Sequence, residues 1–187
     1  MFVIKSSWFK IVLKLMNIKY GKKLVLRGMP LIYKNKQAVM EIGDNVTINS
    51  SLLSNLAGMS RRTCIIARRK NSVIKIGNKV RISGASIYAL KEITIGDGTL
   101  VGVGARIYDT DFHPIDSRYR NPDVVSEIKV LPVKIGKNCF IGANAIILKG
   151  TVLGDGCVVG AGAVVSGMFE ANSVIVGNPA KVVKVLD

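Results

Sequence analysis

The sequence predicts an all-β protein: a three-sided parallel β-helix with a short helical segment before it and one projecting loop. The main observation is a six-residue period of large aliphatic residues, at Ile135, Ile141, Ile147, Leu153, Val159 and Val165. Glycine follows four of these six. An α-helix repeats every 3.6 residues and a single strand every two, so a period of six indicates short strands that alternate with corners.

Three such blocks make one triangular coil of 18 residues. Each side then places one aliphatic side chain inside, and a small residue two positions earlier suits the narrow space near a corner. These earlier positions are Val133, Cys139, Ala145, Thr151, Cys157 and Ala163. Stacked coils pair their strands in parallel, and each buried aliphatic side chain stabilises the fold by about 1.5–3 kcal/mol.

The same phase continues more weakly toward the N-terminus, at Ile42, Ile48, Ile76, Ile82, Ile95, Val101 and Ile107. A chain of 187 residues is long enough for one domain with a sizeable core. We therefore expect a basic amphipathic segment over residues 1–36, a β-helix over 37–181 with a loop at 108–132, and a tail over 182–187.

The N-terminal stretch from Met1 to Tyr20 is apolar but broken by lysines, at Lys5, Lys10, Lys14 and Lys19. It is too charged to span a membrane and lacks a small-residue cleavage site, so it predicts an amphipathic helix. Two interpretations are open. The helix packs against its own fold or a neighbouring subunit, or Phe2, Trp8 and Phe9 enter a membrane interface while the lysines meet anionic headgroups.

The net charge of +15 favours anionic partners, such as nucleic acid, acidic lipids or a phosphate-rich cofactor. No helix-turn-helix, zinc or stacking-aromatic motif accompanies the charge, which argues against nucleic acid. The three cysteines have no CxxC spacing, which favours a soluble protein of the reducing cytoplasm and argues against a metal site. Cys139 and Cys157 lie one coil apart, so we expect them in the core.

The six-residue period stops between Ile107 and Val133. Ile107 and Ile135 are 28 residues apart, four more than a multiple of six, so a loop must project before the coils resume. Long loops in a compact repeat fold are usually functional. The only histidine of the chain, His113, lies near the start of this loop. A neutral imidazole can accept a proton from a hydroxyl group at neutral pH, which makes His113 a candidate general base.

Three segments now carry a resemblance. They are Asp109–Asp116 (Asp-Thr-Asp-Phe-His-Pro-Ile-Asp), the repeats from Ile135-Gly136-Lys137-Asn138 through Val165, and Gly177-Asn178-Pro179-Ala180-Lys181. They resemble the hexapeptide-repeat acyltransferases, in the branch of sugar and polysaccharide O-acetyltransferases, over about residues 40–187. The resemblance implies a left-handed coil, a homotrimer with active sites between subunits, acetyl-CoA as acyl donor without a metal, and His113 as base.

A carboxylate or carbonyl group must orient the imidazole. Asp109, Asp111 and Asp116 are within reach in sequence; Asp111 is the favoured candidate, and a turn role is open for at least one of the three. The resemblance assigns the oxyanion-binding N–H to Ala143. It places Ser83 and Gly84 at the acceptor site, where Asp109 and Asp116 are further candidates.

The resemblance also implies a groove for the pantetheine arm and basic residues near the CoA phosphates. The groove residues are Ala143, Gly160, Ala161 and Ser166, and the basic residues are Lys181 and Lys184. One departure matters. Many relatives read Val-Val-Thr-Lys-Asp-Ile-Pro where this chain has Val164-Val165-Ser166-Gly167-Met168-Phe169-Glu170, so one expected phosphate contact is missing.

The sequence therefore predicts transfer of an acetyl group from acetyl-CoA to a hydroxyl of a sugar or polysaccharide precursor. One alternative is an N-acyltransferase that acts on an amino sugar or an antibiotic. Another is a non-catalytic β-helix scaffold with the basic N-terminus as its interaction surface. A γ-type carbonic anhydrase is excluded because it needs three histidines on zinc. A serine O-acetyltransferase is disfavoured because its long helical N-terminal region is absent.

Overall fold

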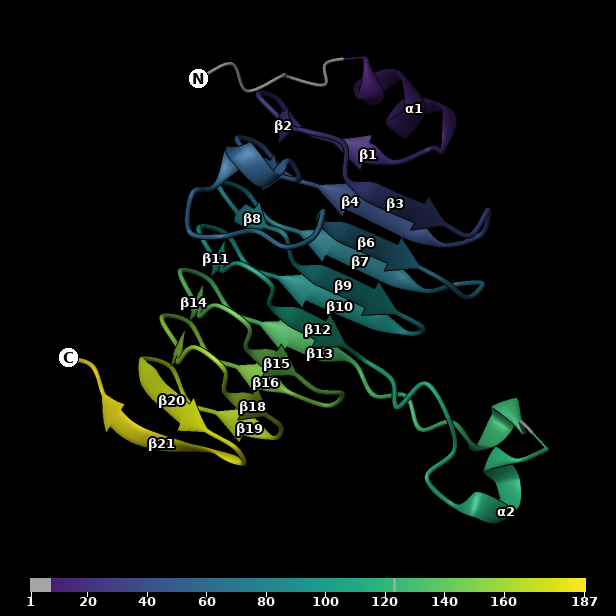
Figure 1. Cartoon of the computed structure of the whole chain (residues 1–187), viewed down its shortest axis with the longest axis vertical. Coiled ribbons are helices and arrows are strands. Elements are labelled where there is room, and N and C mark those ends of the chain that lie inside the picture. Colours follow the sequence, from purple (N-terminus) through teal and green to yellow (C-terminus); the bar gives the residue numbers. More distant parts are fainter. Residues whose placement is uncertain (1–7, 123) are drawn as a thin grey trace.

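The computed structural model describes residues 8–122 and 124–187. Its main body is a stack of three-sided coils whose strands form three parallel sheets, with the termini of the described chain at opposite ends (Figure 1). The chain visits side 1, then side 2, then side 3 of each coil. The predicted alternation of short strands and corners is confirmed.

Side 1 has seven strands: β1 (Lys19–Tyr20), β4 (Val39–Ile42), β7 (Val73–Ile76), β10 (Glu92–Ile95), β13 (Val133–Ile135), β16 (Val152–Leu153) and β19 (Met168–Phe169). Side 2 has eight: β2 (Val25–Arg27), β5 (Thr47–Asn49), β8 (Arg81–Ser83), β11 (Leu100–Val101), β14 (Phe140–Ile141), β17 (Val158–Val159), β20 (Ser173–Gly177) and β21 (Ala180–Val185). Side 3 has six: β3 (Leu31–Lys34), β6 (Cys64–Ala67), β9 (Ser86–Ala89), β12 (Arg106–Tyr108), β15 (Ile146–Ile147) and β18 (Val164–Val165).

The register of the sheets stacks the periodic aliphatic residues in ladders inside the prism. On side 3 the paired residues are Ile65, Ile87, Ile107, Ile147 and Val165, and all five are fully buried. Successive residues of a strand point to opposite faces, so a period of six keeps the same face inward on every side. The core therefore runs along the prism axis and holds the corners at fixed positions.

The cysteines predicted to lie in the core do so. Cys139 is 1% exposed and Cys157 is fully buried, in strand-to-strand register one coil apart. Burial raises the pKa of the Cys139 thiol to about 11. A thiol that stays protonated at neutral pH is a poor nucleophile. Both side chains therefore act as packing residues.

The predicted boundary of the β-helix at residue 37 is wrong. Strands β1, β2 and β3 already pair in parallel with the next coil, so the β-helix begins at Lys19. The first coil carries a weaker aliphatic pattern, because its outer edge is covered by a helix instead of another coil. At the other end, the boundary at residue 182 cuts through β21, which pairs antiparallel with β20.

Of the helix predicted over Met1–Tyr20, the described residues form only α1 (Phe9–Leu15), because Lys19 and Tyr20 already belong to strand β1. Phe9 and Leu13 are buried in the core cluster, so the helix covers the open end of the first coil. Trp8, in contrast, is 54% exposed, and Phe2 lies outside the described residues. In the part of the chain that the structure describes, no helix is long and apolar enough to cross a membrane.

Two segments interrupt the coils. The predicted loop runs from Asp109 to Pro132, contains α2 (Ser117–Arg120) and the 3₁₀ helix η2 (Val125–Glu127), and projects from the corner between sides 3 and 1 (Figure 1). The second, which the sequence did not predict, runs from Ser50 to Thr63 with η1 (Leu52–Ser54) at the corner between sides 2 and 3. We call them the histidine loop and the second loop.

Candidate active site

The histidine loop leaves the prism through a short antiparallel stem. Thr110 forms an isolated bridge with Val130. The N–H of Leu131 donates to the carbonyl of Asp109 at 2.9 Å, and the N–H of Asp111 donates to that of Lys129 at 3.2 Å. His113 lies immediately beyond this stem and is exposed to solvent. The stem therefore holds the imidazole outside the core, as a general base requires.

Asp109 anchors the loop to the coil before it. Its carboxylate is fully buried and accepts the backbone N–H groups of Leu90, Lys91 and Glu92 at 2.6–2.8 Å. Burial raises the pKa of the Asp109 carboxyl, and these three donors act against that rise. This position disagrees with the predicted contact between Asp109 and the acceptor, because both carboxylate oxygens of Asp109 already accept hydrogen bonds inside the fold.

Asp111 anchors the loop to the coil after it. Its Oδ1 lies 2.5 Å from Nζ of Lys149, and the two side chains are only 20% and 21% exposed. Oδ2 of Asp111 is enclosed and has no hydrogen-bond partner among the described residues. The sequence did not indicate Lys149. The only signal for Lys149 in the sequence is its position two residues after Ile147, at the corner from which the histidine loop leaves the prism.

Phe112 fixes the backbone directly before His113. Its φ of 65° lies in the left-handed region, which aromatic residues rarely adopt. Its N–H donates to Oγ1 of Thr110 at 3.0 Å, and its ring lies 5.0 Å from the rings of Tyr88 and Tyr108. The ring contacts on the outer face of side 3 offset the cost of this conformation.

Asp116 is the turn residue that the sequence left open. It caps α2 by accepting the N–H of Arg118 at 2.9 Å, and it forms an ion pair with the same arginine at 2.6 Å. The hydrogen bonds from Arg118 lower the pKa of the Asp116 carboxyl. Asp116 therefore orders the outer part of the loop, away from the stem.

A second set of predicted residues lies at the corner between sides 2 and 3. A Cβ on Gly102 would lie 2.8 Å from the nitrogen of Ala143, and one on Gly142 would lie 2.6 Å from that of Ala161. Glycine is required at both positions because any side chain would strike the next coil. Among the described residues, the half-buried Ala143 N–H has no acceptor, so it can bind an oxyanion.

The other predicted cofactor residues are spread more widely. Gly160 and Ala161 lie at the corner between sides 2 and 3, whereas Ser166 follows β18 at the opposite end of side 3. Lys181 and Lys184 are exposed on β21, the last strand of side 2. Lys181 and Lys184 therefore share side 2 with β14, which precedes Ala143, whereas Ser166 lies at the far end of side 3.

The predicted acceptor residues Ser83 and Gly84 are covered by the second loop. Ser83 is 7% exposed, and its Oγ accepts Nδ2 of Asn49 at 2.9 Å. A Cβ on Gly84 would lie 3.0 Å from the carbonyl oxygen of Arg61 and 3.3 Å from Cγ of Met59. The role of Ser83 and Gly84 at an acceptor site shared with a neighbouring subunit therefore stays a prediction, and in this chain the second loop packs directly on Gly84.

Within one chain, the predicted base and the predicted oxyanion donor are on different corners. His113 belongs to the corner between sides 3 and 1, and Ala143 to the corner between sides 2 and 3. A whole strand of side 3 separates the two corners, about 13 Å for the four residues of β9 at 3.3 Å each. The histidine loop also points away from the prism (Figure 1).

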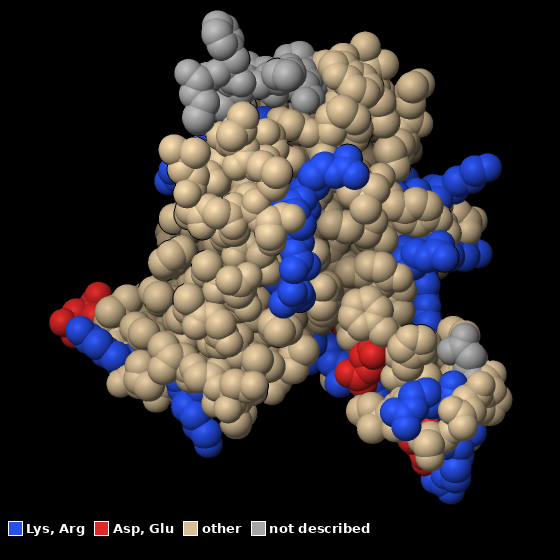
Figure 2. All heavy atoms as spheres, viewed as in Figure 1, with Lys and Arg blue, Asp and Glu red and all other residues tan. Residues whose placement is uncertain are grey.

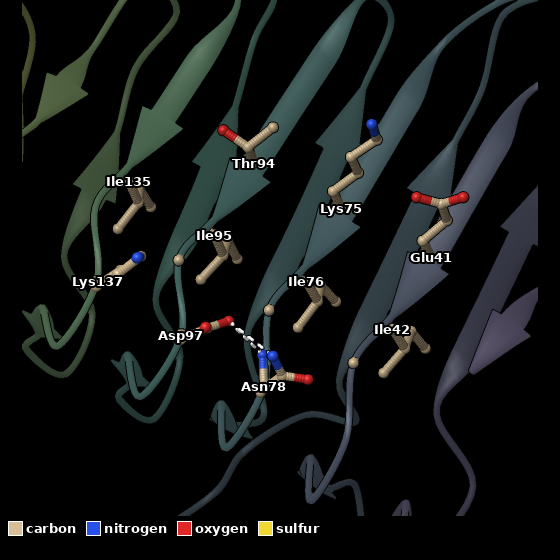
Figure 3. Close-up of a pocket in the computed structure, with 13 residues that line it drawn as sticks. Glu41, Ile42, Lys75, Ile76, Asn78, Thr94, Ile95, Asp97, Ile135 and Lys137 are labelled. Carbon is tan, nitrogen blue, oxygen red and sulfur yellow. Dashed lines mark hydrogen bonds between the residues drawn. The ribbon is translucent and has the colours of Figure 1, made fainter. Parts of the chain in front are cut away.

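A cavity of about 430 Å³ lies elsewhere, across the outer face of side 1. Figure 3 shows Glu41, Lys75 and Thr94 on neighbouring strands beside it, with Asp97 accepting the N–H of Asn78 at 2.7 Å. None of the predicted site residues lines this cavity, and its floor is made of corner glycines. Among the described residues, no group of histidine, cysteine, aspartate or glutamate side chains could hold a metal ion.

Comparisons with known proteins identify the repeat. A profile of the hexapeptide repeat of succinyl-transferase matches residues 132–166. Nodulation protein L of Rhizobium leguminosarum bv. viciae is 46% identical over 110 residues, 58% of this chain and 56% of that protein. The chain shares its repeat with the hexapeptide-repeat acyltransferases over residues 132–166. WbbJ of Escherichia coli K12, a candidate lipopolysaccharide biosynthesis O-acetyl transferase, is another relative of the family, 32% identical over 60% of each chain.

The solved structure of AntD, an N-acyltransferase from Bacillus cereus in complex with dTDP and 3-hydroxybutyryl-CoA, has the same fold. It matches 98% of this chain and 92% of its own with a TM-score of 0.72, at 22% identity. The predicted left-handed parallel β-helix of the hexapeptide-repeat family is confirmed. The sequence matches span about half the length of the curated relatives.

Proposed function

We propose that this protein transfers an acetyl group from acetyl-CoA to a hydroxyl of a sugar or polysaccharide precursor. The observation that carries the proposal is the position of His113, exposed directly beyond an anchored stem in a hexapeptide-repeat acyltransferase. WbbJ is named for O-acetyl transfer in lipopolysaccharide biosynthesis. AntD binds an acyl-CoA, which supports a CoA thioester as donor.

The separation of His113 and Ala143 supports an active site between two copies of the chain. His113 of one subunit would meet the corner of Ala143 on its neighbour, in the homotrimer that the family resemblance implies. Closed cyclic assemblies repeat one such heterologous interface around the ring. Each trimer would then contain three equivalent sites.

In this site the imidazole of His113 accepts the proton of the acceptor hydroxyl while its oxygen attacks the thioester carbonyl. The tetrahedral oxyanion accepts the N–H of Ala143. When the C–S bond breaks, the imidazolium returns its proton to the CoA sulfur. Asp111 is proposed to orient His113 through the loop backbone, since its Oδ1 already binds Lys149. The pantetheine arm would follow Gly160 and Ala161, with Lys181 and Lys184 near the phosphates.

N-acylation of an amino sugar is the second candidate, because AntD is named an N-acyltransferase. The same base would serve an amine acceptor, so the two differ only in the acceptor. Thiol release from acetyl-CoA, measured against matched pairs of hydroxyl and amino sugars, separates them. Turnover confined to the amino members would replace the O-acetyl proposal.

Replacement of His113 by alanine tests the base. We expect kcat to fall by about 10²–10⁴-fold, because general base catalysis typically contributes that much. The fold should be unchanged, since the side chain is exposed and outside the core. The variant keeps Phe112, because this residue fixes the loop backbone directly before residue 113. Full turnover by a folded His113→Ala protein would rule out the mechanism.

Mixed oligomers test the shared site. Neither His113→Ala chains nor Ala143→Pro chains, which lack the N–H at residue 143, should be active alone. Mixing and reassembling the two should restore part of the activity, because some interfaces then combine an intact His113 with an intact Ala143. Circular dichroism and sedimentation first establish that each variant folds and assembles. Absence of recovery in verified mixed oligomers would place both groups in one subunit.

We also propose that the N-terminal region contacts membranes peripherally. Ile11 and Leu15 are 63% and 82% exposed beside Trp8, and Lys10 and Lys14 alternate with them. Such a surface can insert apolar side chains among lipids while its lysines meet anionic headgroups. The proposal is compatible with buried Phe9 and Leu13, which use the opposite face of α1.

A further inference from the structure

Positive side chains gather on the corner between sides 3 and 1, next to the histidine loop. They come from the end of β3 and from the turns that follow β3, β6 and β9, and they comprise Lys34, Lys36, Arg68, Arg69, Lys70 and Lys91. Figure 2 shows lysine and arginine side chains projecting from this edge of the molecule, on the same side as the loop. We call this set the cationic edge.

The cationic edge and the histidine loop border an open surface cavity of about 430 Å³. Arg68, Arg69 and Lys70 line one part of it, and Tyr88 and Phe112 line another. Phe112 precedes His113 directly, so the cavity adjoins the proposed base within a single chain. A volume of this size is typical of small-molecule sites.

Arg68 is held in place without being neutralised. Nη1 of Arg68 donates to the hydroxyl of Tyr33 at 3.3 Å, and its guanidinium lies 5.4 Å from the centre of that ring. Among the residues that the structure describes, no carboxylate forms an ion pair with Arg68, Arg69 or Lys70. Three adjacent cations of one turn repel one another, and a bound anion with two charges or more would relieve that repulsion.

The position of the cavity indicates which substrate carries the anion. The residues proposed for CoA lie on side 2 and its corner with side 3, whereas the cavity lies on the corner of His113. In the shared site the CoA phosphates are proposed at Lys181 and Lys184 of β21, at the C-terminal end of the prism, whereas this cavity lies beside β6 and β9. We therefore assign an anion in the cavity to the acceptor, whose hydroxyl must reach His113. Arginine side chains bind phosphate oxygens through paired N–H donors, which favours phosphate over a single carboxylate.

We propose that the acceptor is a glycosyl diphosphate, with its diphosphate bound by Arg68, Arg69 and Lys70 and its sugar directed to His113. This inference rests on the proposed function, whose acceptor it specifies. Two sources share this chemistry: a sugar linked to a nucleoside diphosphate, and a sugar linked to an isoprenoid diphosphate. The cationic edge recognises the group that both contain.

Calorimetric titration of inorganic pyrophosphate into the full chain, saturated with CoA, tests the site. Saturation with CoA keeps the probe out of the donor groove. An Arg69→Gln, Lys70→Gln double variant should weaken pyrophosphate binding by about tenfold or more, since each lost charge-assisted hydrogen bond contributes to affinity. A Lys75→Gln, Lys134→Gln double variant removes the same charge from side 1 and should leave binding unchanged.

Equal weakening in both double variants would reduce the effect to net charge and overturn the proposal. Pyrophosphate binding that occurs without CoA but is lost in CoA-saturated protein would also overturn the proposal, because the probe would then occupy the donor groove. Titrations with a nucleoside diphosphate sugar and with a farnesyl diphosphate sugar identify the source, and either should bind more tightly than the free sugar. These measurements need no turnover, so they can also be made with His113→Ala protein. A failure of the anion site is therefore distinguished from a failure of the proposed base.

Discussion

At the scale of single residues, the proposed site depends on side chains that tie the histidine loop to the prism. Asp109 binds three backbone N–H groups of the coil before the loop, and Asp111 pairs with Lys149 of the coil after it. Both carboxylates lie within four residues of His113. The loop is long, but the segment that carries the imidazole is fixed at both ends of its stem.

Replacement of Lys149 by methionine should disturb this segment. It would leave the mostly buried Asp111 carboxylate without its cation, at a cost of about 1–3 kcal/mol. We expect a fall in kcat of roughly tenfold with little change in the KM for acetyl-CoA, because the imidazole loses its position while the donor groove is untouched. Steady-state kinetics with a chosen acceptor measure both.

Lys149→Arg should retain most of the activity, since it keeps the ion pair. Lys129→Met, on the stem but with an exposed side chain, is the matched control and should behave as wild type. An unaffected kcat in Lys149→Met would show that the ion pair does not position His113.

At the scale of elements, the second loop distinguishes this chain from a plain stack of coils. It packs on Gly84 through Met59 and the carbonyl of Arg61, at the corner of sides 2 and 3. Ser51 caps η1 and exchanges hydrogen bonds with Ser54 in a capping box. Met59, 5% exposed, is the side chain that packs the loop against the prism.

Replacement of Met59 by alanine should loosen the second loop without unfolding the prism. Loss of a buried methionine side chain costs about 2–5 kcal/mol where the site cannot collapse. Amide hydrogen exchange should therefore accelerate over Ser51–Thr63 and stay slow in β8. Leu56→Ala, at a position 79% exposed in the same loop, should leave exchange unchanged. Uniform acceleration throughout the prism would contradict a locally packed loop.

At the scale of the whole molecule, charge and shape act together. The net charge is +15, and α1 closes one end of the prism while β20 and β21 form a hairpin at the other (Figure 1). The exposed apolar residues of α1 therefore lie at one extremity, where a flat surface could reach them. This arrangement makes the proposed membrane contact testable by comparing the two ends.

A Trp8→Glu, Leu15→Glu double variant should bind anionic vesicles less than wild type in co-sedimentation. It loses apolar contact and adds negative charge near the lysines of α1. The matched control is Val183→Glu, Val185→Glu on the exposed face of β21, which changes the charge equally at the far end. Wild type should pellet with phosphatidylcholine vesicles only when phosphatidylglycerol is present. Equal pelleting of both double variants would remove α1 from the proposal.

The three-sided prism, its core cysteines and the loop with His113 could all be predicted from the amino-acid sequence. These features follow from the local spacing of residues, since each side of a coil uses six consecutive positions. The contacts between coils could be seen only in the folded chain. Lys149 reaches Asp111 from 38 residues away, and the second loop packs on Gly84. Such contacts depend on the corner from which each insertion leaves the prism. The spacing of residues along the chain does not encode them, because strands of successive coils pair whatever the length of the segment between them.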